Sequence, residues 1–98
     1  MPLFNGELSG SLTDRSGTLA AANVSQPVMA ANANRNLAFV SNPSSSVTLW
    51  INIFGGTAVA NGSGSFALPP LQSWSGNITN AINIVGNTIS TPYTAGEL

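Results

Sequence analysis

Turn-forming residues divide this chain into short segments along most of its length. A serine-rich stretch at 42–46, Gly-Gly at 55–56 and Pro-Pro at 69–70 each end a run of apolar and β-branched residues. Turn signals at such short, regular intervals are typical of β-sandwiches and barrels. No segment places apolar residues at the i, i+3, i+4, i+7 spacing of an amphipathic helix. The sequence therefore predicts an all-β fold: a small antiparallel β-sandwich, jelly-roll-like, with a small barrel as the alternative.

Residues 47–54 form the clearest predicted strand. Alternation gives this strand one purely aliphatic face, which we expect in the core. The opposite face carries two large aromatic side chains, so it is either a second buried layer or an interface. The aliphatic face holds Val47, Leu49, Ile51 and Ile53, and the mixed face holds Thr48, Trp50, Asn52 and Phe54.

Shorter strands are predicted on both sides of that segment. Residues 35–41 form one of them, with Ala38 and Val40 on the same face. Pro27 restricts segment 25–30 to an edge strand or a strand start, because proline cannot donate a ladder hydrogen bond. Asn61-Gly62, between extended runs at 57–60 and 65–68, predicts a hairpin. After a segment at 72–75 that carries Trp74, the last two short strands are expected at 82–84 and 88–89, and residues 92–95 close the domain.

The first 16 residues are predicted to form an extended N-terminal arm ahead of a single domain at 17–98, since 98 residues are the size of one domain. The arm is rich in Gly and Ser and carries isolated apolar side chains. It is either a frayed terminus or a segment whose apolar side chains dock onto a neighbouring copy. Those side chains are Leu3, Phe4, Leu8 and Leu12.

Charged residues make up only 5% of the chain, and the net charge is −1. A soluble domain normally has ~25%. The polar surface must therefore be built from neutral side chains, and twelve Asn, thirteen Ser and eight Thr are available. With so little charge, copies repel one another weakly, and association is favoured. We expect a part that contacts copies of itself or other proteins.

The same inventory argues against several functions. The chain has no His, Cys or Lys, so a serine would have no ordinary general base, and we expect no enzyme activity. Two arginines cannot neutralise a nucleic-acid backbone. No run approaches the ~20 apolar residues of a membrane span. Three scattered carboxylates are too few for a metal site, and no cofactor or metal is expected.

Trp50 and Trp74 allow two interpretations. Aromatic rings beside Asn amides can hold sugars, because the ring stacks while the amides bind hydroxyl groups. Alternatively, both tryptophans are core or interface side chains, which is ordinary for a small β-domain. Arg35 could form an ion pair with either Glu97 or Asp14.

Several short motifs follow one another between residues 30 and 97. They are Asn34-Arg35, a strand ending in Asn42-Pro43-Ser44, a strand with Trp50, Gly55-Gly56-Thr57-Ala58, Gly64-Ser65, Leu68-Pro69-Pro70 and Tyr93-Thr94-Ala95. In this order they resemble a family of small structural proteins of tailed-bacteriophage particles.

The resemblance implies a virion protein that cements or decorates the capsid surface and is made in the host cytoplasm. Its partners would be the major capsid protein and copies of itself in a homo-oligomer. The alternative is a fibre or tail β-domain that binds a host glycan through Trp50 and Trp74. The residues expected to make assembly contacts are Leu3, Phe4, Leu8, Leu12, Trp50 and Phe54.

Overall fold

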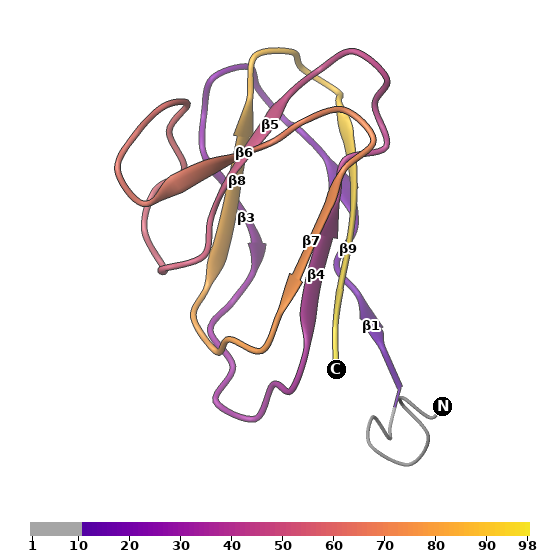
Figure 1. The fold of residues 1–98 in the computed structure, drawn as a ribbon, viewed down its shortest axis with the longest axis vertical. Helices are drawn as coiled ribbons and strands as arrows, with labels where there is room; N and C mark the ends of the chain where they lie inside the picture. The colour runs from indigo at the N-terminus through magenta and orange to yellow at the C-terminus, as the bar shows by residue number, and fades with distance from the viewer. Residues whose placement is uncertain (1–10) are drawn as a thin grey trace.

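The computed structural model describes residues 11–98, and this part of the chain is built from β-strands without a helix (Figure 1). Within it, no helix that could cross a membrane was found. The strands are β1 Thr13–Asp14, β2 Gly17–Thr18, β3 Gln26–Met29, β4 Ala38–Ser41, β5 Leu49–Asn52, β6 Ser65–Leu68, β7 Ser73–Gly76, β8 Ile82–Gly86 and β9 Pro92–Glu97.

Two antiparallel sheets face each other. One has the order β1-β9-β4-β7, with β2 also paired to β9, and the other has the order β3-β8-β5-β6. From β2 to β5 the chain crosses from one sheet to the other at every connection. The crossings from β3 to β4 and from β4 to β5 can be followed in Figure 1. β1 and β2 lie one after the other along β9, so they fill a single strand position, and each sheet then has four positions in an order that forms a jelly roll. The predicted sandwich, with its jelly-roll character, is confirmed.

The core lies between the sheets and is mainly aliphatic. The predicted inner face of the strand at 47–54 is confirmed, because Leu49 and Ile51 are fully buried and the flanking Val47 and Ile53 pack against the core partly buried. The first sheet contributes three small side chains and the large ring of Tyr93. The buried core consists of Leu19, Val28, Met29, Ala38, Val40, Leu49, Ile51, Leu68, Ile82, Ile84, Tyr93 and Ala95.

Asn42 closes one end of the sandwich, directly after β4. Its side chain is fully buried and donates to the carbonyl oxygens of Val47 (2.7 Å) and Leu68 (2.8 Å). Its Oδ1 atom accepts the backbone N–H of Ser44 at 3.0 Å. The turn predicted at 42–46 is therefore present, and one amide ties it to β6.

The hairpin predicted around Asn61-Gly62 is wrong. Asn61 does turn the chain, with φ of 57°, but β6 pairs with β5 and residues 57–60 are not a strand. The backbone of 57–60 instead bonds to side chains: Ala58 N–H donates to Ser25 Oγ and Val59 N–H to Ser65 Oγ, both at 3.0 Å. The β5–β6 connection therefore lies outside the second sheet.

Asn52 holds the start of this connection. Its Oδ1 accepts the N–H groups of Phe54 (2.8 Å) and Gly56 (3.3 Å), and its Nδ2 donates to the carbonyl of Thr57 (3.1 Å). The expected strand at 88–89 is also wrong, because this segment forms the turn before β9.

Part of the predicted arm belongs to the first sheet. Thr13 lies opposite Glu97 and Asp14 opposite Gly96, and β2 continues along β9 in the same register. Between β1 and β2, the N–H of Ala95 donates to Ser16 Oγ at 3.0 Å. The boundary between arm and domain at residue 16 stays a prediction. Three arm positions expected to make contacts, Leu3, Phe4 and Leu8, lie outside the described residues.

Candidate functional site

Glu97 joins two arginines at the end of the sandwich opposite the end closed by Asn42. Arg35 Nε donates to Glu97 Oε1 at 2.9 Å, and Arg15 Nε donates to Glu97 Oε2 at 2.7 Å. Asn32 Nδ2 adds a third donor at 3.2 Å. Of the two partners open to Arg35 in the sequence, the structure selects Glu97.

The remaining donors of Arg35 bind backbone carbonyls. Its side chain is completely buried, and it donates to the carbonyl oxygens of Ala30, Ile78 (3.1 Å) and Asn80 (2.9 Å). The β3–β4 and β7–β8 connections are thereby fixed to β9. A buried charge that is paired and hydrogen-bonded in this way is tolerated, whereas an unpaired one is costly.

Two opposing effects set the pKa of Glu97. Burial raises the pKa of its carboxyl group, but hydrogen bonds from Arg35, Arg15 and Asn32 outweigh burial, so the pKa lies below its ordinary value of 4.5. The pKa of Asp14 is also lowered, by hydrogen bonding from Ser16. Both groups are therefore ionised at neutral pH.

The pairing leaves the surface almost without charge. Between residues 16 and 98 the charged side chains are Arg35 and Glu97, which are 2% and 5% exposed. Exposed charge in the described part of the chain is confined to the β1 region, at Asp14 and at Arg15, whose side chain is 45% exposed. The rest of that surface is formed by neutral side chains and backbone.

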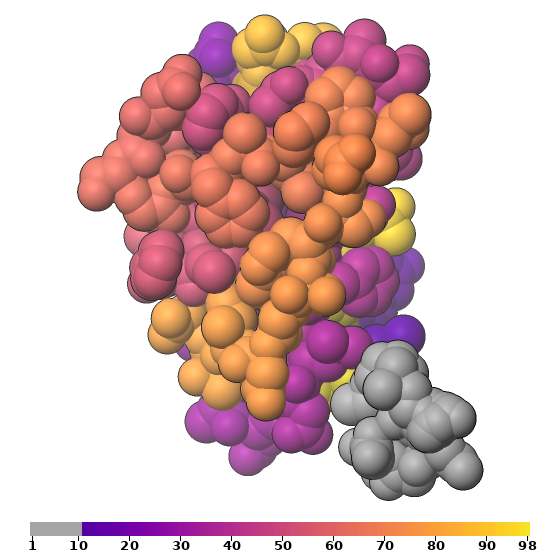
Figure 2. Space-filling view, in the orientation of Figure 1, coloured from indigo at the N-terminus to yellow at the C-terminus, as the bar shows by residue number. Residues whose placement is uncertain are grey.

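The residues predicted to make assembly contacts occupy separate places. Phe54 is 70% exposed at the start of the β5–β6 connection, which Figure 2 shows as a protruding lobe, and Leu12 is 58% exposed just before β1. Trp50 is partly buried on the outer face of β5. Sequence reasoning missed four further exposed apolar side chains, because single apolar residues in or beside turns form no pattern. They are Val24, Val59, Leu71 and Ile89.

Trp74 faces the space between the sheets. It lies opposite the buried Val40 in the register of β4 and β7, and it packs against the core. Its ring contacts Phe66 of β6, with centroids 6.5 Å apart and planes inclined by 58°. Trp50 projects from the far side of the other sheet, so the structure does not bring the two tryptophans together.

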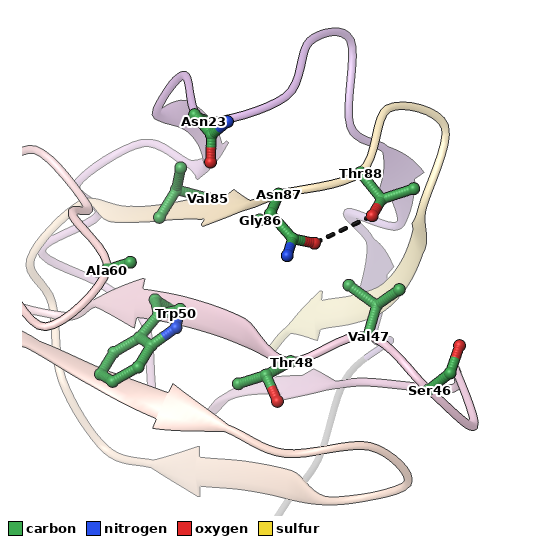
Figure 3. A pocket seen from close by; sticks show the side chains of 10 residues that line it. All are labelled: Asn23, Ser46, Val47, Thr48, Trp50, Ala60, Val85, Gly86, Asn87 and Thr88. Atoms are coloured by element: carbon green, nitrogen blue, oxygen red, sulfur yellow. Dashed lines mark hydrogen bonds between the residues drawn. The ribbon is translucent and has the colours of Figure 1, made fainter.

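A hollow of about 390 Å³ lies beside Trp50 on the outer face of the second sheet (Figure 3). Trp50 of β5 and Val85 of β8, neighbours in the sheet register, lie at its base. Its walls come from the β2–β3 and β5–β6 connections, the segment before β5 and the segment after β8. The lining residues are Asn23, Ser46, Val47, Thr48, Trp50, Ala60, Val85, Gly86, Asn87 and Thr88.

Two hydrogen bonds fix residues that line this hollow. Asn23 has a φ of 61° and donates its backbone N–H to the carbonyl of Gly86 at 2.7 Å. Thr88 Oγ1 donates to Asn87 Oδ1 at 2.9 Å. A second hollow of about 300 Å³ adjoins the first and shares Asn23, Ala60 and Val85 with it.

Within residues 11–98, no three carboxylate, His or Cys side chains come together as metal ligands. Comparisons of the chain with protein-family models, with curated proteins and with solved structures found no match.

Proposed function

We propose that this domain is a structural subunit of a larger assembly, and specifically a protein that cements or decorates the capsid of a tailed bacteriophage. The observation that carries the proposal is the surface of residues 16–98, where both charged side chains are buried and paired with each other. The proposal assigns the protein no catalytic activity.

A neutral surface suits contact with many copies. Charged groups must lose water when an interface forms, and that loss is costly where pairing is imperfect. Charged residues are accordingly depleted from the cores of protein interfaces. A surface of Asn, Ser and Thr avoids this cost, and its small net charge offers little repulsion between copies.

The sequence resemblance across residues 30–97 supports placement on a phage particle. A protein that binds the assembled shell and not its free subunits stabilises the shell through mass action. Repeated weak contacts on a symmetric shell strengthen one another by avidity. Jelly rolls occur in viral capsid and lectin domains, which is compatible with the proposal, although a fold by itself does not assign a function.

Sedimentation with capsid shells tests the proposal. The shells are assembled from the major capsid protein of the phage that encodes this chain, without the chain itself. We expect the added protein to sediment with the shells at low and at high salt. Phe54→Ser and Leu12→Ser should weaken binding, whereas the equally exposed control Leu71→Ser should not. A chain that stays in the supernatant with intact shells contradicts the proposal.

The alternative function, a fibre or tail domain that binds a host glycan, is favoured by one observation, the polar hollow beside Trp50. Trp74 adds no support to it, because its ring packs against the core and Phe66.

A further inference from the structure

We infer that the hollow beside Trp50 binds an uncharged saccharide, with the indole ring as a stacking surface and Asn87 as a hydrogen-bond donor. The inference deepens the glycan alternative, and it depends on the hollow alone. It does not require a position on a capsid, so sugar binding and shell binding can fail independently.

Trp50 presents its ring because its neighbours on the outer face are small. It lies opposite Ala67 of β6 and Val85 of β8. The indole is only partly buried, and none of the hydrogen bonds among residues 11–98 uses its Nε1–H. An aromatic ring with an apolar face and a free polar edge matches a sugar, which has an apolar face and a rim of hydroxyl groups.

Asn87 and Asn23 supply complementary groups on the opposite wall. Because Thr88 occupies Oδ1 of Asn87, the amide nitrogen of Asn87 points into the hollow, as Figure 3 shows. The side-chain oxygen of Asn23 also points inward. A donor and an acceptor thus face the same space as the indole, an arrangement that can fix the orientation of vicinal hydroxyl groups.

The lining selects for an uncharged ligand. None of the ten lining residues is ionisable, so no group is present to compensate a carboxylate, sulfate or phosphate. Five of them end in an amide or a hydroxyl group: Asn23, Ser46, Thr48, Asn87 and Thr88. A volume of about 390 Å³ lies at the small end of the range for ligand pockets. The adjoining hollow past Ala60 offers room for a saccharide to continue.

The two tryptophans make the test internally controlled. In a ¹H–¹⁵N spectrum of the full chain, each tryptophan gives its own indole N–H signal. The probes are the methyl glycosides of glucose, galactose, mannose and N-acetylglucosamine at millimolar concentration, with N-acetylneuraminic acid as a charged comparison. We expect at least one neutral glycoside to shift the Trp50 signal in a saturable manner, while the Trp74 signal stays in place.

Variants then assign the contact. Asn87→Ala should weaken the affinity by about tenfold, the loss expected for one hydrogen bond. The control Asn77→Ala removes an exposed amide outside the hollow and should leave the affinity unchanged. Trp50→Ala should abolish binding, followed through the backbone signal of Gly86. Thermal unfolding of each variant checks that the fold is retained.

Three results would overturn the inference. The first is a Trp50 signal that no neutral glycoside moves. The second is an equal response to N-acetylneuraminic acid. The third is a Trp50 signal that shifts with protein concentration in the absence of sugar, because a second copy would then cover the hollow.

Discussion

At the scale of single residues, a few buried polar side chains hold the ends of this sandwich in place. Glu97 gathers Arg15, Arg35 and Asn32 at one end, and Asn42 binds two carbonyl groups at the other. Because the sequence has few carboxylates, only Asp14 and Glu97 were considered as ion-pair partners of Arg35, and the sequence could not decide between them. The pairing of β9 with β4 places Glu97 beside Arg35. Burial of Asn42 had no sequence signal, since its neighbours predict an exposed turn.

Replacing Glu97 with Gln should destabilise the fold strongly. The variant leaves the charge of Arg35 buried and unpaired, and the loss of one partner from a buried pair costs about 3–5 kcal/mol. Urea unfolding of the variant and of the original chain measures the difference. Asp14→Asn, which removes an exposed carboxylate, is the matched control and should change stability little. Equal urea midpoints for all three proteins would show that the buried pair contributes nothing to folding stability.

The lowered pKa of Glu97 also predicts how stability depends on pH. A carboxyl group with a pKa depressed on folding contributes its full stabilisation above its unfolded pKa, near its ordinary value of 4.5. That contribution is lost progressively as the pH falls through the folded pKa. Thermal unfolding across the acid range should therefore show falling stability below about pH 4.5 in the original chain. Glu97→Gln should flatten this decline. If stability falls with pH as steeply in the variant as in the original chain, groups other than Glu97 cause the acid sensitivity.

Asn42→Ala tests the other end of the sandwich. The variant removes the donors to the carbonyls of Val47 and Leu68. The bond to Leu68 is buried, and an unsatisfied buried group costs about 1–3 kcal/mol. The control is Asn77→Ala at an exposed position. Chemical unfolding should show a clear loss of folding stability for Asn42→Ala and almost none for Asn77→Ala. Similar stabilities would mean that water replaces the side chain of Asn42 at no cost.

At the scale of elements, β9 organises the first sheet, because β1, β2 and β4 all pair with it. Gly96 lies opposite Phe39, whose ring covers the glycine. A Cβ atom at position 96 would lie 2.7 Å from Phe39 Cε2 and 3.2 Å from the carbonyl oxygen of Thr13. This strand thus accepts no side chain at that position without movement of its neighbours.

A double-mutant cycle measures this contact. Gly96→Ala should cost about 1–3 kcal/mol, as overpacking of well-packed sites does. In a Phe39→Ala background the same substitution should cost clearly less, because the obstructing ring is gone. Thermal or urea unfolding of the four proteins gives the coupling energy. Additive effects would show that Phe39 does not restrict position 96.

The elements also show where sequence reasoning works and where it fails. Alternation was sufficient to predict the buried face of β5, because sheet burial follows side-chain parity. The predicted hairpin failed because Ser25, Asn52 and Ser65 supply side-chain partners to the backbone of 54–59, which no local pattern reveals. The hollow beside Trp50 could not be predicted, since its walls come from segments distant in sequence.

At the scale of the whole molecule, the jelly roll combines a conventional aliphatic core with a surface almost free of charge. The low charge content was visible in the sequence, but the burial of Arg35 and Glu97 was not. That burial turns a low charge content into a neutral surface over residues 16–98. Contacts made by such a surface are not electrostatic, so screening should affect them little even at ~1 M salt, where the Debye length is ~3 Å.

The most direct test of this account is the mass of the full chain in solution, measured by light scattering after size exclusion over a range of protein concentrations at low and high salt. We predict a closed homo-oligomer whose mass is the same at both salt concentrations. A monomer at every concentration, or an oligomer that dissociates as salt is added, would contradict the claim that the neutral surface of residues 16–98 favours assembly.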